Sequence, residues 1–209
     1  MQVARMSEAF EQSGPSFSFK PFSSILQPLI EEVLAEQGKD KFRKGTILIP
    51  QLLVWLVLAL TVRRDLNCQK VLNWLVSGLR WMQLLFPAKG TLVQEGAISH
   101  ARVKMGVEVF RALFVKLTGT CQNLKADFHG LVTVIFDGTT ATMPDTESNE
   151  NEFKRPKSGR GKGAFPQMRI MALMAWSARV ILDMAYAAYC GKGTGERTLV
   201  MQILDQTSL

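Results

Sequence analysis

Apolar residues recur at helical spacing along the first half of the chain. The first stripe has members three and four positions apart, as one face of a helix requires; it consists of Ile25, Leu26, Leu29, Ile30, Val33 and Leu34. Ser24 can cap this helix, and Pro28 is tolerated in a first turn. Gly38 is a typical stop signal. The pattern therefore predicts a helix that begins at Ser24 and ends before Gly38.

Four more helices are predicted before residue 120. The second begins at Pro50 and is apolar on nearly every side through Val62, which is typical of the central helix of a bundle. A third starts from an Asn67 cap and ends at Gly78. The last two cover residues 96–106 and 107–118.

The spacing changes in the second half of the chain. Residues 131–136 are apolar and β-branched, which predicts a short strand buried on both faces. Two strand-like runs, residues 169–176 and 180–189, are close enough to form an antiparallel hairpin. A long polar loop, residues 141–167, precedes them, and a final helix is predicted over residues 196–205. These elements together predict an α+β protein.

Charge and composition narrow the class of protein. The chain has 25 Lys and Arg against 18 Asp and Glu, a formal charge of +7, with a pI near 9.5. This surplus favours a polyanionic partner, nucleic acid before a membrane. The N-terminal residues lack a signal-peptide pattern, and the longest apolar run is too short to span a bilayer. We therefore expect a cytoplasmic protein with no membrane partner.

Cysteine and histidine are too scattered for a metal site of the zinc type. The three cysteines, Cys68, Cys121 and Cys190, lie far apart and form no C-x-x-C pair. The two histidines, His100 and His129, are also isolated. The odd number of cysteines is typical of a reducing compartment.

The segment over residues 96–106 has an apolar inside and a basic outside. Ile98, Ala101 and Met105 share one face, while His100, Arg102 and Lys104 point elsewhere and Ser99 lies near the start. The candidate DNA contacts are Ser99, Arg102 and Lys104. A short helix of this kind between other helices fits a helix-turn-helix recognition element. A basic amphipathic surface helix has the same pattern, and spacing alone does not separate the two.

Asp137 is the candidate catalytic residue. It follows the predicted buried strand, where sheet enzymes often place reactive groups, and Gly138 beside it lets a metal, a phosphate or backbone approach closely. Cleavage of a phosphodiester by two divalent cations needs several carboxylates to hold them, and one carboxylate is not enough. Asp-Gly is also a favoured turn pair, so Asp137 opening a turn is the alternative interpretation.

The long polar loop is acidic in its first half and basic in its second. Its candidate phosphate contacts are Lys154, Arg155, Arg160 and Lys162; a solvated run of charge is the alternative. The glycine-rich segments 158–163 and 191–195 lack the spacing of a P-loop, which excludes a nucleotide site of that type. An RNA-binding protein is a third interpretation, but the aromatic stacking residues that it needs are missing.

The chain resembles transposases of the insertion-sequence-four group. The helical half matches in Ile98-Ser-His-Ala-Arg102 and Phe110-Arg-Ala-Leu-Phe114, among other pieces. The second half matches in Asp137-Gly-Thr-Thr140, Met143-Pro-Asp-Thr146 and Gly163-Ala-Phe-Pro-Gln167, in that order. The order of these motifs is more specific than any one of them, and the resemblance runs over most of the chain.

This resemblance implies a fold and a chemistry. It implies a helical, DNA-binding N-terminal domain (23–120) and a partial ribonuclease-H-like catalytic domain (130–209). The polar, Ser-rich composition of residues 1–22 predicts a flexible arm before them. Family members use an Asp-Asp-Glu triad with Mg²⁺, and Asp137 matches the first aspartate, a metal ligand. The implied partner is DNA at transposon ends, in association with the nucleoid.

The rest of the triad has no match. The family's second aspartate lies in an Asp-Arg context and its glutamate lies far downstream, and neither motif occurs here. Asp183, in the hairpin, and Glu196, at a helix start, are weak substitutes. We therefore expect a C-terminally truncated transposase that is inactive alone. The alternative is a non-catalytic DNA-binding remnant, or an inhibitor of the intact transposase that occupies transposon ends. Another transposase chain is a second candidate partner.

Overall fold

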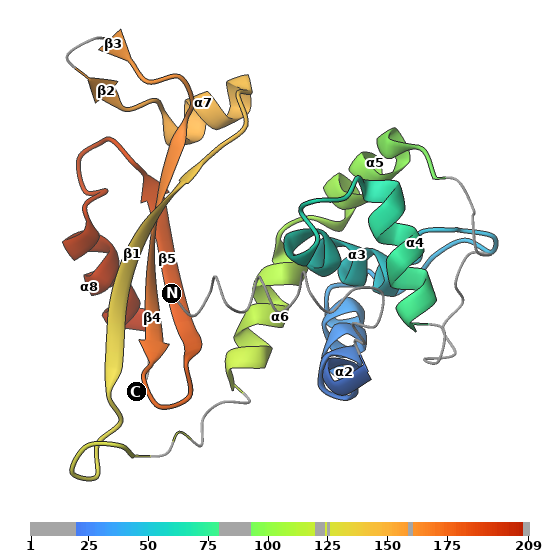
Figure 1. The fold of residues 1–209 in the computed structure, drawn as a ribbon, viewed down its shortest axis with the longest axis horizontal. Helices are drawn as coiled ribbons and strands as arrows, with labels where there is room; N and C mark the ends of the chain where they lie inside the picture. The colour runs from blue at the N-terminus through green and yellow to red at the C-terminus, as the bar shows by residue number, and fades with distance from the viewer. Residues whose placement is uncertain (1–19, 80–92, 120–123, 125, 159–160, 207–209) are drawn as a thin grey trace. The chain divides into compact units, whose positions relative to one another are not determined.

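A computed structural model describes residues 20–79, 93–119, 124, 126–158 and 161–206 (Figure 1). The chain divides into two compact units, Met1–Leu117 and Thr118–Leu209. We call them the helical unit and the sheet unit and describe each by itself. The predicted flexible arm lies for the most part outside the described residues.

The helical unit is built around a helix that is buried on most sides. Its described helices are α2 (Lys20–Glu36), α3 (Pro50–Val62), α4 (Cys68–Leu79), α5 (Glu95–Met105) and α6 (Glu108–Gly119). Buried residues of α3 include Leu52, Trp55 and Leu56. The indole Nε1 of Trp55 donates to Gln27 Oε1 of α2 at 2.8 Å, so the polar group of the largest core side chain is satisfied. The predicted central position of this helix is confirmed.

Local signals set most helix ends. Pro50 begins α3 as predicted, and Asn67 Oδ1 accepts from the Lys70 amide at 2.9 Å, which makes Asn67 the predicted cap of α4. Gly38, at φ +61°, follows α2. The predicted start of α2 is wrong, because the helix already begins at Lys20 and has Pro28 in its interior. Packing of its buried face against α3 supports the helix despite the missing proline N–H.

The sheet unit is a three-stranded antiparallel sheet with one helix on it. The strands β1 (Val134–Thr142), β4 (Gln167–Ala175) and β5 (Val180–Ala188) pair in the order β1-β4-β5. Helix α8 (Glu196–Gln206) lies along one face of these strands (Figure 1). The buried residues between helix and sheet are Met171, Leu173, Ala185, Leu199 and Ile203. The predicted hairpin and final helix are confirmed.

The first strand differs from its prediction. It begins at Val134 and continues beyond Asp137, so this aspartate lies inside the strand rather than after its end. Burial on both faces is also wrong: Leu131, placed in the predicted strand, is 66% exposed. The physical reason is that the pairing is antiparallel and α8 covers one face only, so the other face remains open among the described residues.

The loop between β1 and β4 has secondary structure of its own. It contains the short helix α7 (Glu147–Phe153) and a small hairpin of β2 (Lys157–Ser158) and β3 (Gly161–Lys162). The architecture is α+β, as predicted. No helix among the described residues is long and apolar enough to cross a membrane.

Candidate functional site

Asp137 lies on the sheet face that α8 does not cover. Its neighbours in β1, Phe136 and Gly138, both face α8: Phe136 packs against the core beneath that helix, and the space beside Gly138 meets Glu196. Because successive side chains of a strand point to opposite faces, Asp137 points away from α8. It is exposed and stands opposite Ala172 of β4.

Gly138 leaves room that another side chain fills. A Cβ at this position would lie 3.2 Å from Met171 Cε and 3.5 Å from both Cδ and Oε1 of Glu196. The carboxylate of Glu196 therefore lies against the strand next to Asp137 in sequence, but on the opposite face. The groups that approach Gly138 closely within this chain are thus the side chains of Met171 and Glu196, and not backbone.

The described carboxylates do not assemble a two-cation site. Asp183 lies in β5, and its Oδ1 accepts from the Met184 amide at 2.7 Å. Glu196 and Asp137 are separated by the strand itself. Among the residues that the structure describes, no group of three or more His, Cys, Asp or Glu could hold a metal ion. Asp137 fits a single ligand of a divalent cation, and this donor set is smaller than two cations require.

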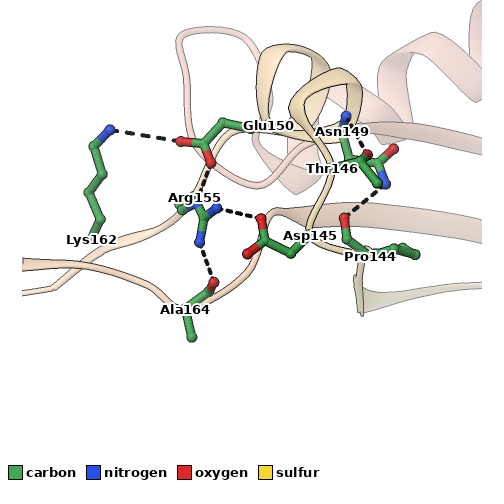
Figure 2. Close-up of polar contacts among 8 residues, drawn as sticks. All are labelled: Pro144, Asp145, Thr146, Asn149, Glu150, Arg155, Lys162 and Ala164. Atoms are coloured by element: carbon green, nitrogen blue, oxygen red, sulfur yellow. Dashed lines mark hydrogen bonds and ion pairs between the residues drawn. The ribbon is translucent and has the colours of Figure 1, made fainter.

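The polar loop is held together by side chains of its own sequence. Thr146 caps α7, since its Oγ1 accepts from the Asn149 amide at 3.2 Å. The side chain of Asn149 reaches back to the carbonyl of Pro144 at 3.0 Å (Figure 2). These contacts order the first half of the loop.

Arg155 ties three parts of this loop together (Figure 2). Its Nη2 lies 2.6 Å from Asp145 Oδ1, its Nε donates to Glu150, and its Nη1 donates to the Ala164 carbonyl. The side chain is only 20% exposed. Hydrogen bonding to Arg155 lowers the pKa of Glu150 below its ordinary value. We call Arg155, Asp145, Glu150 and Ala164 the Arg155 cluster.

The other candidate phosphate contacts of the loop are placed differently. Lys162 is 74% exposed, and its Nζ lies 3.8 Å from Glu150 Oε1, a loose ion pair. Lys154 is exposed and follows α7 with a φ of +59°. Arg160 lies outside the described residues. Lys154 and Lys162 are thus open to a ligand, whereas the hydrogen-bonding groups of Arg155 are used inside the loop.

Helix α5 exposes the residues selected from its sequence. Ile98 and Met105 are buried against the helical core, while Ser99, Arg102 and Lys104 are exposed. Gly106, at φ +76°, ends the helix, and its amide donates to the Arg102 carbonyl at 3.1 Å. The predicted division into an apolar inside and a basic outside is therefore seen in the structure.

Sequence reasoning missed two basic features. One is the loop over residues 39–44, whose Lys39 Nζ donates to the Lys104 carbonyl of α5 at 3.0 Å; its signal was four cations in six positions. The other is Arg169 of β4, which stacks on Tyr189 at 5.0 Å and donates to the Thr194 carbonyl at 3.1 Å. No local pattern marks Arg169, because its contacts come from the segment after β5.

Comparison with known proteins shows what the helical unit is similar to. Residues 18–115 match the family described as insertion element 4 transposase N-terminal. The helical unit is therefore similar to the N-terminal domain of this transposase family, which confirms the resemblance seen in the sequence.

Two relatives from Escherichia coli (strain K12) extend this comparison. The chain is 25% identical over 181 residues to "Transposase InsG for insertion sequence element IS4", an alignment that covers 86% of this chain and 38% of InsG. It is 30% identical over 102 residues to InsZ, named as a putative transposase, covering 47% of this chain and 34% of InsZ. The chain thus spans less than two fifths of either relative. No solved structure matches.

Proposed function

We propose that this chain is part of a DNA transposase of the insertion element 4 group. The similarity to InsG carries the proposal, because an alignment over 181 of 209 residues necessarily runs through the helical unit and past Asp137. In this proposal the helical unit binds duplex DNA, and the sheet unit is the start of a ribonuclease-H-like catalytic domain.

Two groups of cations contact DNA phosphates in this proposal. Arg102 and Lys104, with the hydroxyl of Ser99 beside them, lie exposed on α5. Lys154 and Lys162 are exposed in the polar loop of the sheet unit. Arg155 supports this loop from within, since its guanidinium already binds two carboxylates and a carbonyl. Contacts of this kind position a duplex without reading its sequence.

Asp137 is the first acidic ligand of the catalytic metal in this proposal. Transposases of this group generally use a divalent metal such as Mg²⁺, which supplies charge stabilisation for phosphoryl transfer. The exposed position of Asp137 on the open sheet face supports its role as a ligand. Among the described residues, no group of three or more His, Cys, Asp or Glu could hold a metal ion, so we expect no strand cleavage by this chain alone.

Fluorescence anisotropy tests the binding part of the proposal. The full chain is titrated with a labelled duplex that carries insertion-sequence ends and with an unrelated duplex, at several salt concentrations. We expect binding whose log Kd rises linearly with log salt concentration, as phosphate contacts require. Absence of salt-dependent binding to either duplex would contradict the proposal.

A cleavage assay tests the catalytic part. Supercoiled DNA is incubated with the chain and Mg²⁺ or Mn²⁺, and no metal-dependent nicking is expected. Nicking that Asp137→Asn abolishes would show that the site is complete without further carboxylates.

A non-catalytic inhibitor is the second candidate function, and the solitary placement of Asp137 favours it. In that case, adding the chain to an active transposase of the same group reduces end cleavage, either by occupying DNA ends or by pairing with the second transposase chain. Unchanged cleavage at concentrations that saturate the DNA ends excludes the inhibitor.

A further inference from the structure

A basic loop lies beside helix α5, although the two are far apart in sequence. Residues 39–44 contain Lys39, Lys41, Arg43 and Lys44 with a single acidic residue, Asp40. All four cations are exposed. The loop contacts α5 directly, because Lys39 Nζ donates to the Lys104 carbonyl at 3.0 Å. A lysine at this position also satisfies a free carbonyl of the last helical turn.

The path of this loop is set at both ends by backbone conformation. Gly38 (φ +61°) and Gly45 (φ +85°) occupy the left-handed region that favours glycine. At the first end, the Lys39 amide donates to the Leu34 carbonyl at 2.7 Å, which ties the loop to the buried end of α2. At the second end, the Thr46 amide donates to the Arg43 carbonyl at 3.0 Å, which closes a tight turn. The loop is therefore anchored where it leaves and re-enters the helical unit.

Together the loop and α5 present an excess of positive charge, with six cations against the two acidic residues Asp40 and Glu95. The six cations of this surface are Lys39, Lys41, Arg43, Lys44, Arg102 and Lys104, all of them exposed. Within the described parts of the chain, none of them forms an ion pair, in contrast to Arg63, Arg111, Lys116 and Arg155. Uncompensated cations at this density attract a polyanion.

An apolar side chain stands among these cations. Val103 of α5 is 82% exposed, the most exposed of the large apolar side chains among the described residues. It lies one turn after Ser99, so the two share a stripe on the outer face of the helix. Val103 contributes almost nothing to the core in this position. A small apolar group between cations matches the edge of a base pair in the major groove, where the thymine methyl is an apolar target between two phosphate backbones.

We propose that residues 39–44 and the outer face of α5 form one duplex-DNA surface. Lys41, Arg43 and Lys44 contact phosphates, and Val103 contacts a thymine methyl in the major groove. This inference rests on the proposed DNA binding and names the residues that perform it. Charge complementarity favours DNA over a protein partner, because all six cations are exposed and none forms an ion pair within the described parts of the chain.

Binding of the full chain to two labelled duplexes tests this surface. One duplex is selected by the wild-type chain from a random-sequence pool, and the other is a scrambled version. The triple variant Lys41→Ala/Arg43→Ala/Lys44→Ala should weaken binding to both, and should reduce the slope of log Kd against log salt by about 0.9 for each lost phosphate contact. Arg111→Ala is the matched control, since Arg111 is exposed but paired with Glu108.

Val103 is tested by its effect on sequence preference. Val103→Ala should weaken binding to the selected duplex about fourfold, as expected for loss of roughly one buried methylene's worth of contact, and leave the scrambled duplex unchanged. Replacing thymines of the selected duplex by uracil, one at a time, should reproduce this loss at one position for wild type and have no effect there for Val103→Ala. Thermal unfolding of each variant checks that the fold is kept.

The outcomes separate the two proposals. If the wild-type chain shows no salt-dependent binding, the proposed function itself fails. If the wild-type chain binds but the triple variant and Val103→Ala behave like Arg111→Ala, DNA binding stands and this surface is wrong. A change of sedimentation coefficient in Val103→Ala, without a change in DNA binding, would assign the valine to a protein contact and overturn the inference.

Discussion

The two units bury their apolar residues in different ways. In the helical unit, α2, α3, α4, α5 and α6 all contribute to one core, and α3 is buried on most of its sides. Among the described residues of the sheet unit, the buried cluster between one face of the sheet and α8 has five members. A bundle surrounds its central helix, whereas a sheet with a helix on one side leaves its second face to solvent.

The second face of the sheet carries large apolar side chains that are only partly buried. The strand register places Ile181, Met184 and Tyr186 on the side away from α8, and each is close to half exposed. Asp137 lies on this same side. We therefore expect the core of the helical unit to stabilise its fold, and the sheet unit to have a smaller free energy of unfolding.

The largest expected effect comes from removing a core side chain of the sheet unit. Leu173 is fully buried, and Leu173→Ala should cost about 2–5 kcal/mol of unfolding free energy. Because the core is so small, we expect amide hydrogen exchange in the sheet unit to lose most of its protection, with the helical unit unchanged. Leu56→Ala, at an equally buried position in α3, is the matched control and should affect the helical unit only. Equal loss in both units would contradict the independence of the two cores.

A smaller effect is expected from the Arg155 cluster. Arg155→Ala leaves Asp145, Glu150 and the Ala164 carbonyl without their shared donor. We expect faster exchange and faster protease cleavage over residues 144–166, with little change elsewhere. Arg155→Lys should fall between wild type and alanine, because a lysine keeps the charge but lacks the planar fork. The control is Lys162→Ala, which removes only a loose ion pair. If Lys162→Ala increases exchange in the loop as much as Arg155→Ala does, the Arg155 cluster is not what stabilises the loop.

The same cluster predicts an acid-sensitive loop. The pKa of Glu150 is lowered in the folded state from its ordinary value of 4.5, so its contribution to stability is complete above that value. The contribution is lost as the pH falls through the lowered, folded value. Protection of residues 144–166, followed by NMR, should thus be constant from neutral pH to about pH 5 and decline at more acidic pH. In Glu150→Gln this decline should be reduced.

The smallest expected effects come from replacing two glycines by alanine, one with free space around it and one with close neighbours. Gly96, in α5, has nothing within 4 Å of the place that an alanine Cβ would occupy, so Gly96→Ala should stabilise the helical unit by about 0.5 kcal/mol. Gly138→Ala gains similar chain entropy but places its Cβ 3.2 Å from Met171 Cε. We expect that contact to offset the gain and leave the sheet unit's unfolding free energy nearly unchanged. A clear stabilisation of Gly138→Ala would show that Met171 and Glu196 move aside without cost.

Sequence reasoning succeeded where the determinants are local. Pro50 and Asn67 are themselves the helix-start signals, and their positions in α3 and α4 match the prediction. The helix α7 was missed because its sequence, ESNENEF, has no apolar stripe; the cap at Thr146 was its only local signal. The bounds of β1 were missed because β4 extends the pairing through Asp137 to Thr142.

The candidate site was predictable only in part, for a related reason. The exposure of Arg102 and Lys104 follows from the helical period of their own segment. The partners of Arg155 are acidic residues five and ten positions before it, and only the folded loop brings both to one guanidinium. Likewise, the separation of Asp137 from Glu196 depends on which face α8 covers, and the sequence of neither segment contains this information.

The position of β1 at the edge of the described sheet gives the charge of Asp137 a second effect. β1 forms the border of the described sheet, and Asp137 is the only charged residue among its nine positions. An outward-facing charge on a border strand discourages two copies from joining their sheets. Asp137→Asn, chosen to remove a metal ligand, would also remove this safeguard, so any change in DNA nicking or metal binding has to be judged beside its tendency to self-associate. Asp137→Glu keeps the charge and separates the two causes.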